Sequence, residues 1–256
     1  MPAQSIDEAL AALDDIIERA RRDSDRRGYF AVLYRKVTAN VKDAIDAGVF
    51  DDAERMARLD ILFANRYLDA EHAHTRGGEL TRSWRIAFDA CTRWRPLLLQ
   101  HLLAGINAHI NLDLGIAAAR CSPGPRLADL RGDYGRINDI LASMIAQVQE
   151  NIGTVSPLLG LLDTIGGRRD DEIIKFSITH ARNGAWRFAT RLAALPEAAW
   201  ADAIDDQDRR VSLVAHAVLR PGLLSAGLLV IRLAESNDVA RNIDALAVAP
   251  EPELSP

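Results

Sequence analysis

One segment of the chain, residues 100–115, combines strong hydrophobicity with an unusual number of polar side chains. It reads QHLLAGINAHINLDLG. Because Leu, Ile, Ala and Gly occupy most of its positions, a helix of this sequence is expected to lie in the protein interior. Buried polar groups need hydrogen-bond partners, since without them their burial costs free energy. The segment therefore predicts one wall of a functional site, built from His101, Asn107, His109, Asn111 and Asp113.

Helical spacing sorts four of these side chains into two pairs. His109 and Asp113 share one face of a helix, and Asn107 and Asn111 share another. The two faces lie about 160° apart on a regular helix, so the four side chains cannot all point into one cavity. At least one pair must instead bond to a neighbouring backbone or line a different surface.

His101 lies far along the helix from the other histidine of the segment. Eight residues of straight helix span about 12 Å, and Gly105 is the plausible place for a break that would bring His101 to face His109. Asp69, on a preceding helix, is the best candidate to meet the segment from outside. The candidate catalytic residues are therefore His101, His109, Asp113 and Asp69.

Three interpretations of the His109–Asp113 pair stay open. A His and a carboxylate one turn apart can chelate a divalent cation such as zinc or iron. They can also work without a metal as a general acid–base pair, or form a buried hydrogen bond that only orients the helix. A metal on this pair would need ligands from other helices. The candidates for these ligands are His72, His74, Asp69, Glu71, His180 and His216.

Further side chains are candidates for substrate binding. Trp84 beside Arg85 can close a pocket by stacking, although a core Trp with an extended Arg is the commoner arrangement. Arg187 can bind an anionic group or pair with one of the many Asp residues. His216, within the apolar run LVAHAVL, is expected to be a hydrogen-bonded core residue. The substrate-binding candidates are Asn107, Asn111, Trp84, Tyr67 and Arg187.

Composition and missing motifs argue against several classes of protein. The formal net charge is −5 and no basic stripe with interleaved aromatic side chains is present, so nucleic-acid binding is not expected. The sequence has no Gly-rich phosphate loop, which argues against a nucleotide cofactor, and no G-x-S-x-G or H-E-x-x-H motif. Cys91 and Cys121 stand far apart and outside any CxxC pattern, so neither a disulfide framework nor a thiolate zinc site is expected.

The chain is expected to be a cytoplasmic protein without a membrane span. Its N-terminus lacks the basic start and apolar core of a signal peptide. The longest largely apolar stretch, Leu223–Ile231, is far shorter than the ~20 residues that a membrane helix needs. The residues leave the oligomeric state open.

Helical periodicity runs through nearly the whole chain, with breaks at Gly and Pro and no convincing strand pattern. We therefore predict an all-α, bundle-like fold around the buried motif helix. It forms a single domain over residues 1–236, followed by a short helix and a disordered Pro/Glu-rich tail over 237–256. Capping patterns place helix starts at Ser5, Asp51 and Thr81. Further helices are expected over residues 24–47, 96–120, 133–152, 170–194, 196–219 and 222–236.

Three segments resemble an uncharacterised all-helical family that is catalogued as domain of unknown function 5995. They are Phe63–Asp69 (FANRYLD), Ser83–Phe88 (SWRIAF) and Gln100–Leu114. The resemblance extends over about residues 12–235, and the block NAHINLDL is its most distinctive part. It implies an all-helical fold and brings no activity with it. His72 and His74 lie outside the family's pattern, which weakens them as ligands.

The His-x-x-x-Asp step is also similar to a ligand pair of the zinc-dependent phospholipase C and P1 nuclease group, another all-α fold. That group's further His after the Asp and its later His-x-x-x-Glu are missing here. The corresponding steps from His180 and His216 reach Gly184 and Arg220. The likeness is therefore an analogy and no sign of membership.

Two functions fit these observations. The first is an enzyme that acts on a small, largely apolar molecule in a pocket between helices, as a hydrolase or as a lyase or cyclase of specialised metabolism. His109 and Asp113 would then bind a divalent metal or act as the acid–base pair. The second is a non-catalytic helical protein that binds a lipid-like ligand or a protein partner. A stoichiometric transition metal in the purified protein would favour the enzyme.

Overall fold

The computed structural model describes residues 2–158, 170–220 and 225–248. Helix accounts for 82% of the structure, and none of the described residues forms a strand. The prediction of an all-α fold is confirmed. The helices are α1 (Ile6–Arg22), α2 (Arg27–Asp46), α3 (Ala53–Thr75), α4 (Arg82–Cys91), α5 (Leu98–Ala108), η1 (His109–Asp113), α6 (Leu114–Cys121), η2 (Gly124–Leu130), α7 (Arg131–Val155), α9 (Asp170–Ala193), η3 (Glu197–Ala199), α10 (Trp200–Leu219), α11 (Ser225–Ala234) and α12 (Val239–Ala247).

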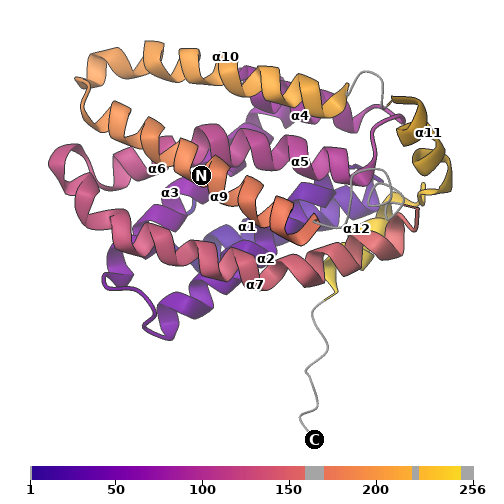
Figure 1. The fold of residues 1–256 in the computed structure, drawn as a ribbon, viewed down its shortest axis with the longest axis horizontal. Helices are drawn as coiled ribbons and strands as arrows, with labels where there is room; N and C mark the ends of the chain where they lie inside the picture. Colours follow the sequence, from indigo (N-terminus) through magenta and orange to yellow (C-terminus); the bar gives the residue numbers. More distant parts are fainter. Residues whose placement is uncertain (1, 159–169, 221–224, 249–256) are drawn as a thin grey trace, which may run out of the picture.

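A single long helix runs through the middle of the bundle. It consists of α5, the π-helical turn η1 and α6, and extends over Leu98–Cys121. α2, α4 and α10 pack against α5, while α3 and α9 pack against α6. Figure 1 shows this central helix with α10 on one side and α2 and α7 on the other. The prediction of a buried motif helix surrounded by other helices is thus confirmed.

The central helix is also long and apolar enough to cross a membrane, and no other helix in the described ranges meets that criterion. The sequence analysis placed the longest apolar stretch at Leu223–Ile231 and was wrong there, because the uncharged polar residues of the central helix hardly lower its hydropathy. The helix is enclosed: 78% of its apolar window is buried inside the protein. Since the core helix of a globular protein has the same properties, this is weak evidence for a membrane span.

Two glycines let neighbouring helices approach the central helix closely. A Cβ atom on Gly105 would lie 2.6 Å from Cδ2 of Phe30 in α2. A Cβ atom on Gly115 would lie 2.7 Å from Cδ1 of Phe188 and 2.9 Å from the carbonyl oxygen of Ala185, both in α9. Gly105 is therefore a point of close packing, and the helix does not break there as the sequence analysis considered.

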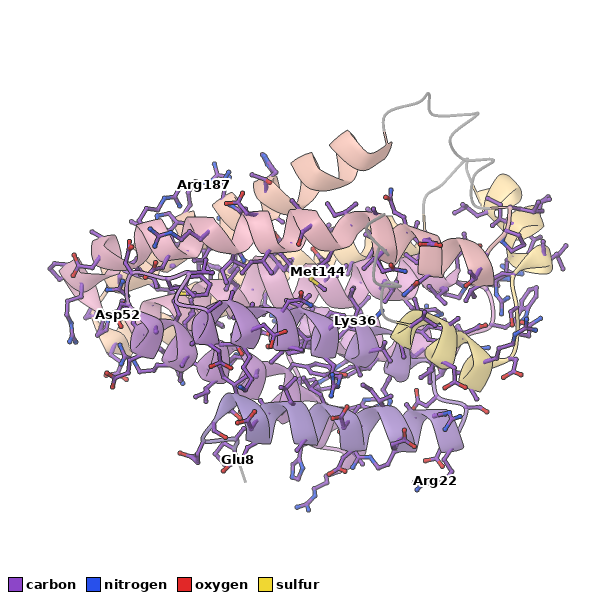
Figure 2. All side chains as sticks on the ribbon, turned by 90° about the horizontal axis from the view of Figure 1, so that it is seen from below. Glu8, Arg22, Lys36, Asp52, Met144 and Arg187 are labelled. Carbon is purple, nitrogen blue, oxygen red and sulfur yellow. The ribbon has the colours of Figure 1, made fainter. Side chains whose placement is uncertain are left out.

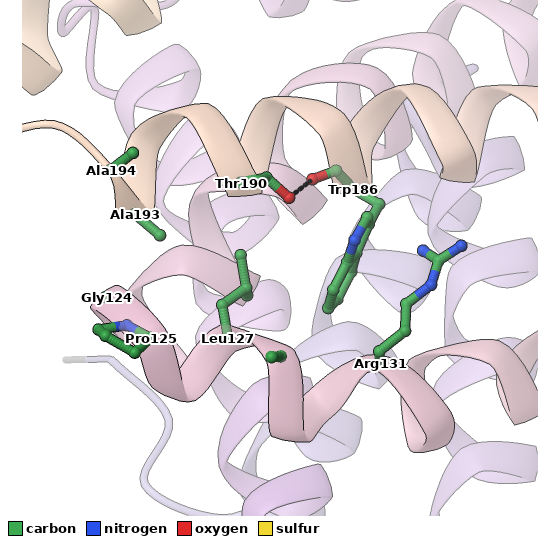
Figure 3. Close-up of a pocket in the computed structure, with 9 residues that line it drawn as sticks. Gly124, Pro125, Leu127, Arg131, Trp186, Thr190, Ala193 and Ala194 are labelled. Carbon is green, nitrogen blue, oxygen red and sulfur yellow. Dashed lines mark hydrogen bonds between the residues drawn. The ribbon is translucent and has the colours of Figure 1, made fainter.

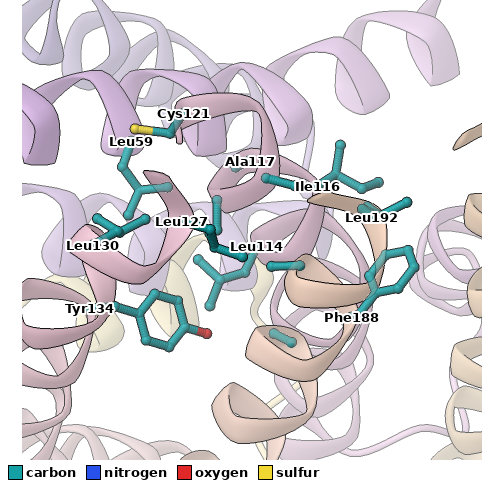
Figure 4. Packing of buried hydrophobic residues seen from close by; sticks show 14 of the residues in the cluster. Leu59, Leu114, Ile116, Ala117, Cys121, Leu127, Leu130, Tyr134, Phe188 and Leu192 are labelled. Atoms are coloured by element: carbon teal, nitrogen blue, oxygen red, sulfur yellow. The ribbon is translucent and has the colours of Figure 1, made fainter. Parts of the chain in front are cut away.

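An apolar cluster surrounds α6 and fixes the end of the central helix. Figure 4 shows Ile116 of α6 with Leu59 of α3, Leu130 of η2, and Phe188 and Leu192 of α9, all buried. Large aliphatic and aromatic side chains in such contact supply most of the free energy that holds helices together. Because α6 is held in this way, the polar residues that precede it have a rigid support.

Side-chain caps begin several helices where the sequence predicted them. The hydroxyl of Ser5 accepts a backbone N–H of α1, and that of Thr81 accepts one of α4. For α3 the cap is Asp52 and not the predicted Asp51. The carboxylate of Asp133 accepts the backbone N–H of both residues, at 2.8 and 3.1 Å, and so fixes the chain just before α3. The cap of α3 therefore lies one residue after the predicted position.

The C-terminal half agrees with the predicted pattern wherever it is described. The predicted helix over 196–219 divides into η3 and α10, and α11 and α12 follow. α12 confirms the short helix expected within residues 237–256, while the tail from residue 249 lies outside the described residues, as does the predicted break at Gly166-Gly167. The limits of the single domain stay a prediction.

Candidate functional site

The central helix changes to π-helical geometry over His109–Asp113, the core of the motif. A π turn contains an extra residue, which leaves backbone groups without their regular helical partners. One such carbonyl, that of Asn111, accepts the side-chain amide of Gln207 in α10 at 3.0 Å. π turns inside α-helices are often found at functional sites. The irregularity therefore marks the segment that the sequence analysis selected for its chemistry.

Asp113 is a fully buried carboxylate that three N–H groups hold. Its Oδ2 accepts the indole N–H of Trp84 at 2.8 Å and lies 3.2 Å from Nδ1 of His109, while its Oδ1 accepts the Nε–H of Arg66 at 3.0 Å. Burial by itself would raise the pKa of Asp113, but the hydrogen bond with His109 and the charge of Arg66 outweigh it, so the pKa lies below its usual range. Asp113 is therefore ionised at neutral pH.

His109 lies in a cage of aromatic rings. Its imidazole stacks on Phe63 with 3.6 Å between ring centroids and 8° between planes, and Tyr34 meets it edge-on at 4.4 Å. The remaining rings around it are Phe30, Tyr67 and Trp84. The residue is 2% exposed, and this burial lowers its pKa despite the opposing effect of Asp113. The imidazole is therefore neutral at neutral pH.

The contact with Asp113 determines the tautomer of His109. An ionised carboxylate only accepts hydrogen bonds, so the proton of the neutral ring must lie on Nδ1. Nε2 then carries a lone pair. That atom is buried and has no hydrogen-bond partner among the described residues. A buried acceptor without a partner is unusual, because it costs free energy that a bound group would recover.

More buried polar atoms without hydrogen-bond partners among the described residues lie on α2 and α3, the helices whose rings pack around the imidazole. They are the hydroxyl oxygens of Tyr34, Thr38 and Tyr67 and Oδ2 of Asp60. Burial raises the pKa of Asp60 to about 7, so this carboxyl is close to half-protonated at neutral pH. The sequence analysis missed Tyr34, Thr38 and Asp60. Asp60 has one recognisable signal, since it occupies the apolar stripe of α3 between Met56 and Phe63.

Arg66 is a further residue that the sequence analysis missed. It lies within FANRYLD, one of the segments that carried the family resemblance, yet only its neighbours were selected there. Its side chain is 28% exposed, whereas the carboxylate that it binds, that of Asp113, is fully buried. Tyr67 and Trp84, which were predicted, both reach the site: Trp84 bonds to Asp113, and the Tyr67 ring lies 6.1 Å from that of His109.

The asparagine pair faces α10 instead of the imidazole. Nδ2 of Asn107 donates to the carbonyl of Val211 at 2.9 Å, and Nδ2 of Asn111 donates to Oδ1 of Asn107 at 3.0 Å. This is the outcome expected for one of the two pairs, a bond to a neighbouring backbone. In the structure these two residues tie helices together, and they do not share the surroundings of His109.

His101 is buried in a different environment. It is 4% exposed, its Nδ1 lies 3.9 Å from Sγ of Cys91, and its ring contacts that of Tyr29. Burial lowers the pKa of His101 to about 3, and the charges of Arg26 and Arg232 add to this effect. The three motif residues are thus buried as expected, but only His109 and Asp113 meet.

Several other candidates lie at the surface. Asp69 and Arg187 are exposed, and neither reaches the imidazole; Figure 2 shows Arg187 pointing away from the bundle, on the side opposite α1, whose ends are marked by Glu8 and Arg22.

His216 is exposed, so its prediction as a core histidine is wrong. Its apolar neighbours in the sequence belong to an outward face of α10, where Leu213 and Val214 are exposed too.

The remaining ligand candidates do not join the His109–Asp113 pair either. His72 and His180 are exposed, and His74 packs against Phe88. Glu71 pairs with Arg19 and Arg27.

Fold and site together define an all-helical protein with a buried His–Asp pair on a π turn of its central helix. The chain matches the model of a family of unknown function (DUF5995) over residues 6–221. It therefore belongs to this family, as the resemblance indicated. No curated protein and no solved structure matches the chain.

Proposed function

We propose that the protein is an enzyme acting on a small, largely apolar molecule at the site between α2, α3 and the central helix, with His109 and Asp113 as its acid–base pair. The observation that carries the proposal is the free Nε2 of His109. This atom belongs to a neutral imidazole whose other nitrogen is held by a carboxylate, and it is buried without a partner in the described part of the chain. Such a nitrogen is ready to accept a proton from a bound molecule.

The neighbours of the pair support this role. Trp84 and Arg66 keep Asp113 ionised, so that its charge can stabilise the imidazolium that forms when Nε2 gains a proton. The aromatic rings around His109 suit an apolar substrate with few polar groups. Hydrolases, lyases and cyclases all employ a positioned base of this kind.

A metal-dependent form of the proposal, with zinc or iron on His109 and Asp113, has less support. Three N–H groups already bond to the oxygens of Asp113, and its Oδ2 bonds to Nδ1 of His109, so the two residues do not present Nε2 and this carboxylate to one ion as a chelating pair. Within the described ranges, no three or more His, Cys, Asp or Glu side chains are grouped as a metal site requires. Metal analysis of the purified protein, with and without prior chelation, tests this form directly.

Access to the site is part of the proposal. Arg66 lies between the buried carboxylate of Asp113 and the solvent, because its own side chain is partly exposed. A swing of this side chain toward solvent would expose the carboxylate of Asp113.

The variant His109→Gln tests the proposal, since Gln can donate to Asp113 but has no basic nitrogen. Purified wild-type protein and variant are incubated with a panel of small apolar ketones, esters and prenyl compounds, and the products are identified by mass spectrometry. We expect conversion by the wild type and a loss of at least 100-fold in the variant, the scale of a general base. His216→Gln, at an exposed position, is the matched control. Equal conversion by His109→Gln and wild type would refute the acid–base role.

A second candidate, a non-catalytic protein that binds a lipid-like ligand, is favoured by a groove elsewhere on the surface. The groove has a volume of about 650 Å³, within the range of small-molecule sites. Leu127 and Ala193 contribute to its apolar lining, and the guanidinium of Arg131 lies 4.8 Å from the ring centroid of Trp186 (Figure 3). An apolar chain with one carboxylate suits this combination. Dodecanoate should change the fluorescence of Trp186 in the wild type, and less so in Arg131→Gln.

A further inference from the structure

The buried site contains more unpaired polar atoms than one acid–base pair explains. Five side-chain atoms on α2, α3 and η1 are buried without a well-formed hydrogen bond among the described residues: the hydroxyls of Tyr34, Thr38 and Tyr67, Oδ2 of Asp60, and Nε2 of His109 itself. The hydroxyls of Tyr34 and Thr38 lie close enough to interact with each other, so the atoms that most clearly lack a partner are those of Asp60, Tyr67 and His109. Protein interiors pair nearly all such atoms, or fill the space between them with bound water or ligand. Such atoms on three adjacent elements, α2, α3 and η1, therefore indicate that a small molecule binds between them.

Ring contacts bring together the segments of α2, α3 and η1 that carry these atoms. Tyr34 and Thr38 are one turn apart on α2, and the Tyr34 ring lies 4.4 Å from that of His109. Asp60 lies one turn before Phe63 on α3, and Phe63 stacks on His109 at 3.6 Å. Asp60 is also the charge that acts most strongly on the hydroxyl of Tyr34. Tyr34 thus stands next to both the imidazole and the carboxyl.

The chemistry of the set points to a neutral guest. Tyr34, Thr38 and a protonated Asp60 offer O–H donors, and Nε2 of His109 offers a lone pair. The cation that reaches this site among the described residues, Arg66, is already bonded to Asp113. An anionic ligand would therefore lack a counter-charge. A carbonyl or hydroxyl group matches the donors, and the aromatic walls match an apolar remainder.

Building on the proposed function, we infer that these atoms form the polar end of the substrate site, which receives the carbonyl group of a small neutral ketone, and that Asp60 is its proton donor. His109 takes a proton from the carbon next to the carbonyl, and that C–H electron pair becomes a C=C bond. The carbonyl π electrons move to oxygen, which takes the proton of Asp60. The product is an enol, with an imidazolium and an ionised Asp60. In the reverse step the imidazolium returns its proton to the same carbon, or to the γ-carbon where the ketone is β,γ-unsaturated, and the enol O–H returns its proton to Asp60. The net result is hydrogen exchange or double-bond isomerisation, and neither needs an oxidant or reductant.

This assignment gives the two buried acids of the site opposite roles. Asp113 accepts three N–H groups and stays ionised, whereas Oδ2 of Asp60 accepts none from the described residues and this carboxyl retains its proton toward neutral pH. Two titratable groups whose environments separate their pKa values in this way supply one base and one acid at the same pH.

The first test measures binding without requiring turnover. Protein labelled with ¹⁵N in His and ¹³C in Asp carboxyls is titrated at pH 6 with cyclohexanone, and separately with methylenecyclohexane, which has the same shape but no oxygen. We expect Asp60 to be protonated, and its signal and that of Nε2 of His109 to shift with cyclohexanone alone. Asp60→Asn, which can still donate to a carbonyl, should retain the shift at His109, and Asp60→Leu should lose it. Asp69→Asn, an exposed acid of the same helix, is the control. An ionised Asp60 at pH 6, equal shifts with both probes, or no shift would overturn the inference.

The second test separates this inference from the proposed function. Exchange of the α-hydrogens of cyclohexanone in D₂O is followed in the wild type, His109→Gln, Asp60→Asn and Asp60→Leu, with thermal melts as a check on folding. Asp60→Asn should bind the ketone yet lose at least tenfold in exchange, because an amide cannot give up a proton as a carboxylic acid does. Exchange that depends on His109 but not on Asp60 would support the acid–base pair of His109 and Asp113 and refute the role of Asp60. Binding that depends on Asp60, with exchange unaffected in His109→Gln, would refute the pair and support the carbonyl subsite.

Discussion

Nδ1 of His109 lies 3.2 Å from Oδ2 of Asp113, and that same oxygen accepts the indole N–H of Trp84 at 2.8 Å. The carboxylate therefore does not belong to the imidazole alone: it also anchors α4 through Trp84 and α3 through Arg66. This shared anchoring makes Asp113 both a positioning residue for the imidazole and a structural link between three elements. The positioning role and the structural role of Asp113 can be told apart by substituting His109 and Asp113 separately.

Asp113→Asn should be strongly destabilising. The amide carries no charge to balance Arg66, and its NH₂ group would face N–H donors that now bond to a carboxylate. Removing one partner of a buried ion pair costs about 3–5 kcal/mol, a large share of the roughly 5–15 kcal/mol that stabilises a protein of this kind. Urea unfolding followed by circular dichroism measures the loss. Asp69→Asn, exposed on α3, should stay within about 0.5 kcal/mol of the wild type. A cost below about 1 kcal/mol for Asp113→Asn would show that the network is not structural.

Arg66→Met should change how stability depends on acid pH. The pKa of Asp113 is lowered in the folded protein, in part by Arg66, so the unfolded state binds more protons as the pH falls. The stability that this carboxylate contributes is present above the unfolded pKa of about 3.9 and is lost as the pH falls through the lower folded value. Without Arg66 the folded pKa rises toward the unfolded value, so the variant should lose less stability between pH 6 and 3, and its loss should end at higher pH. Unfolding free energies at pH 3–6 check this, and identical pH curves for the variant and wild type would contradict it.

Asp60 should affect the pH dependence of the unfolding free energy in the sense opposite to Asp113, and Asp60→Asn should remove this effect. Its folded pKa, raised to about 7, exceeds the unfolded value, so folding takes up a proton between the two. The stability due to this group is complete below about pH 4, declines as the pH rises toward 7, and is constant above it, with a total difference of at most about 4 kcal/mol. The wild type should therefore lose stability relative to Asp60→Asn between pH 4 and 7. A flat difference curve would place the pKa of Asp60 at its ordinary value.

The elements of this protein could be predicted largely because their signals are local. The cap at Ser5, the break after Cys121 and the apolar stripes depend on neighbours within a few residues, and these were found where expected. The His109–Asp113 contact was predictable for the same reason, since a separation of four residues brings side chains together on any helix.

The features that were missed depend on contacts between distant segments. The π turn is stabilised by Gln207 of α10, which takes up a carbonyl of the turn, and a 3.6-residue periodicity does not reveal it. Asp60 has a local signal, its place in the apolar stripe of α3, but only the packing of distant segments shows that its carboxyl is buried without a partner on Oδ2 among the described residues. The prediction for His216 was wrong in the opposite sense. Its apolar neighbours in the sequence suggested burial, but the face of α10 that carries it is exposed.

Gly115→Ala should destabilise the protein, although replacing glycine by alanine in a helix is usually favourable. Alanine favours a helix over glycine by about 1 kcal/mol, but the added Cβ would lie 2.9 Å from the carbonyl oxygen of Ala185 and 2.7 Å from the ring of Phe188. A backbone carbonyl cannot move aside as a flexible side chain can, so α9 must shift away from α6, and overpacking of this kind costs about 1–3 kcal/mol. Gly135→Ala in α7 is the matched control, because its Cβ meets no atom within 4 Å, and it should be neutral or stabilising. Thermal melts of both variants measure the contrast. If Gly115→Ala melted at or above the temperature of Gly135→Ala, the close approach of α6 and α9 would not be a constraint on the fold.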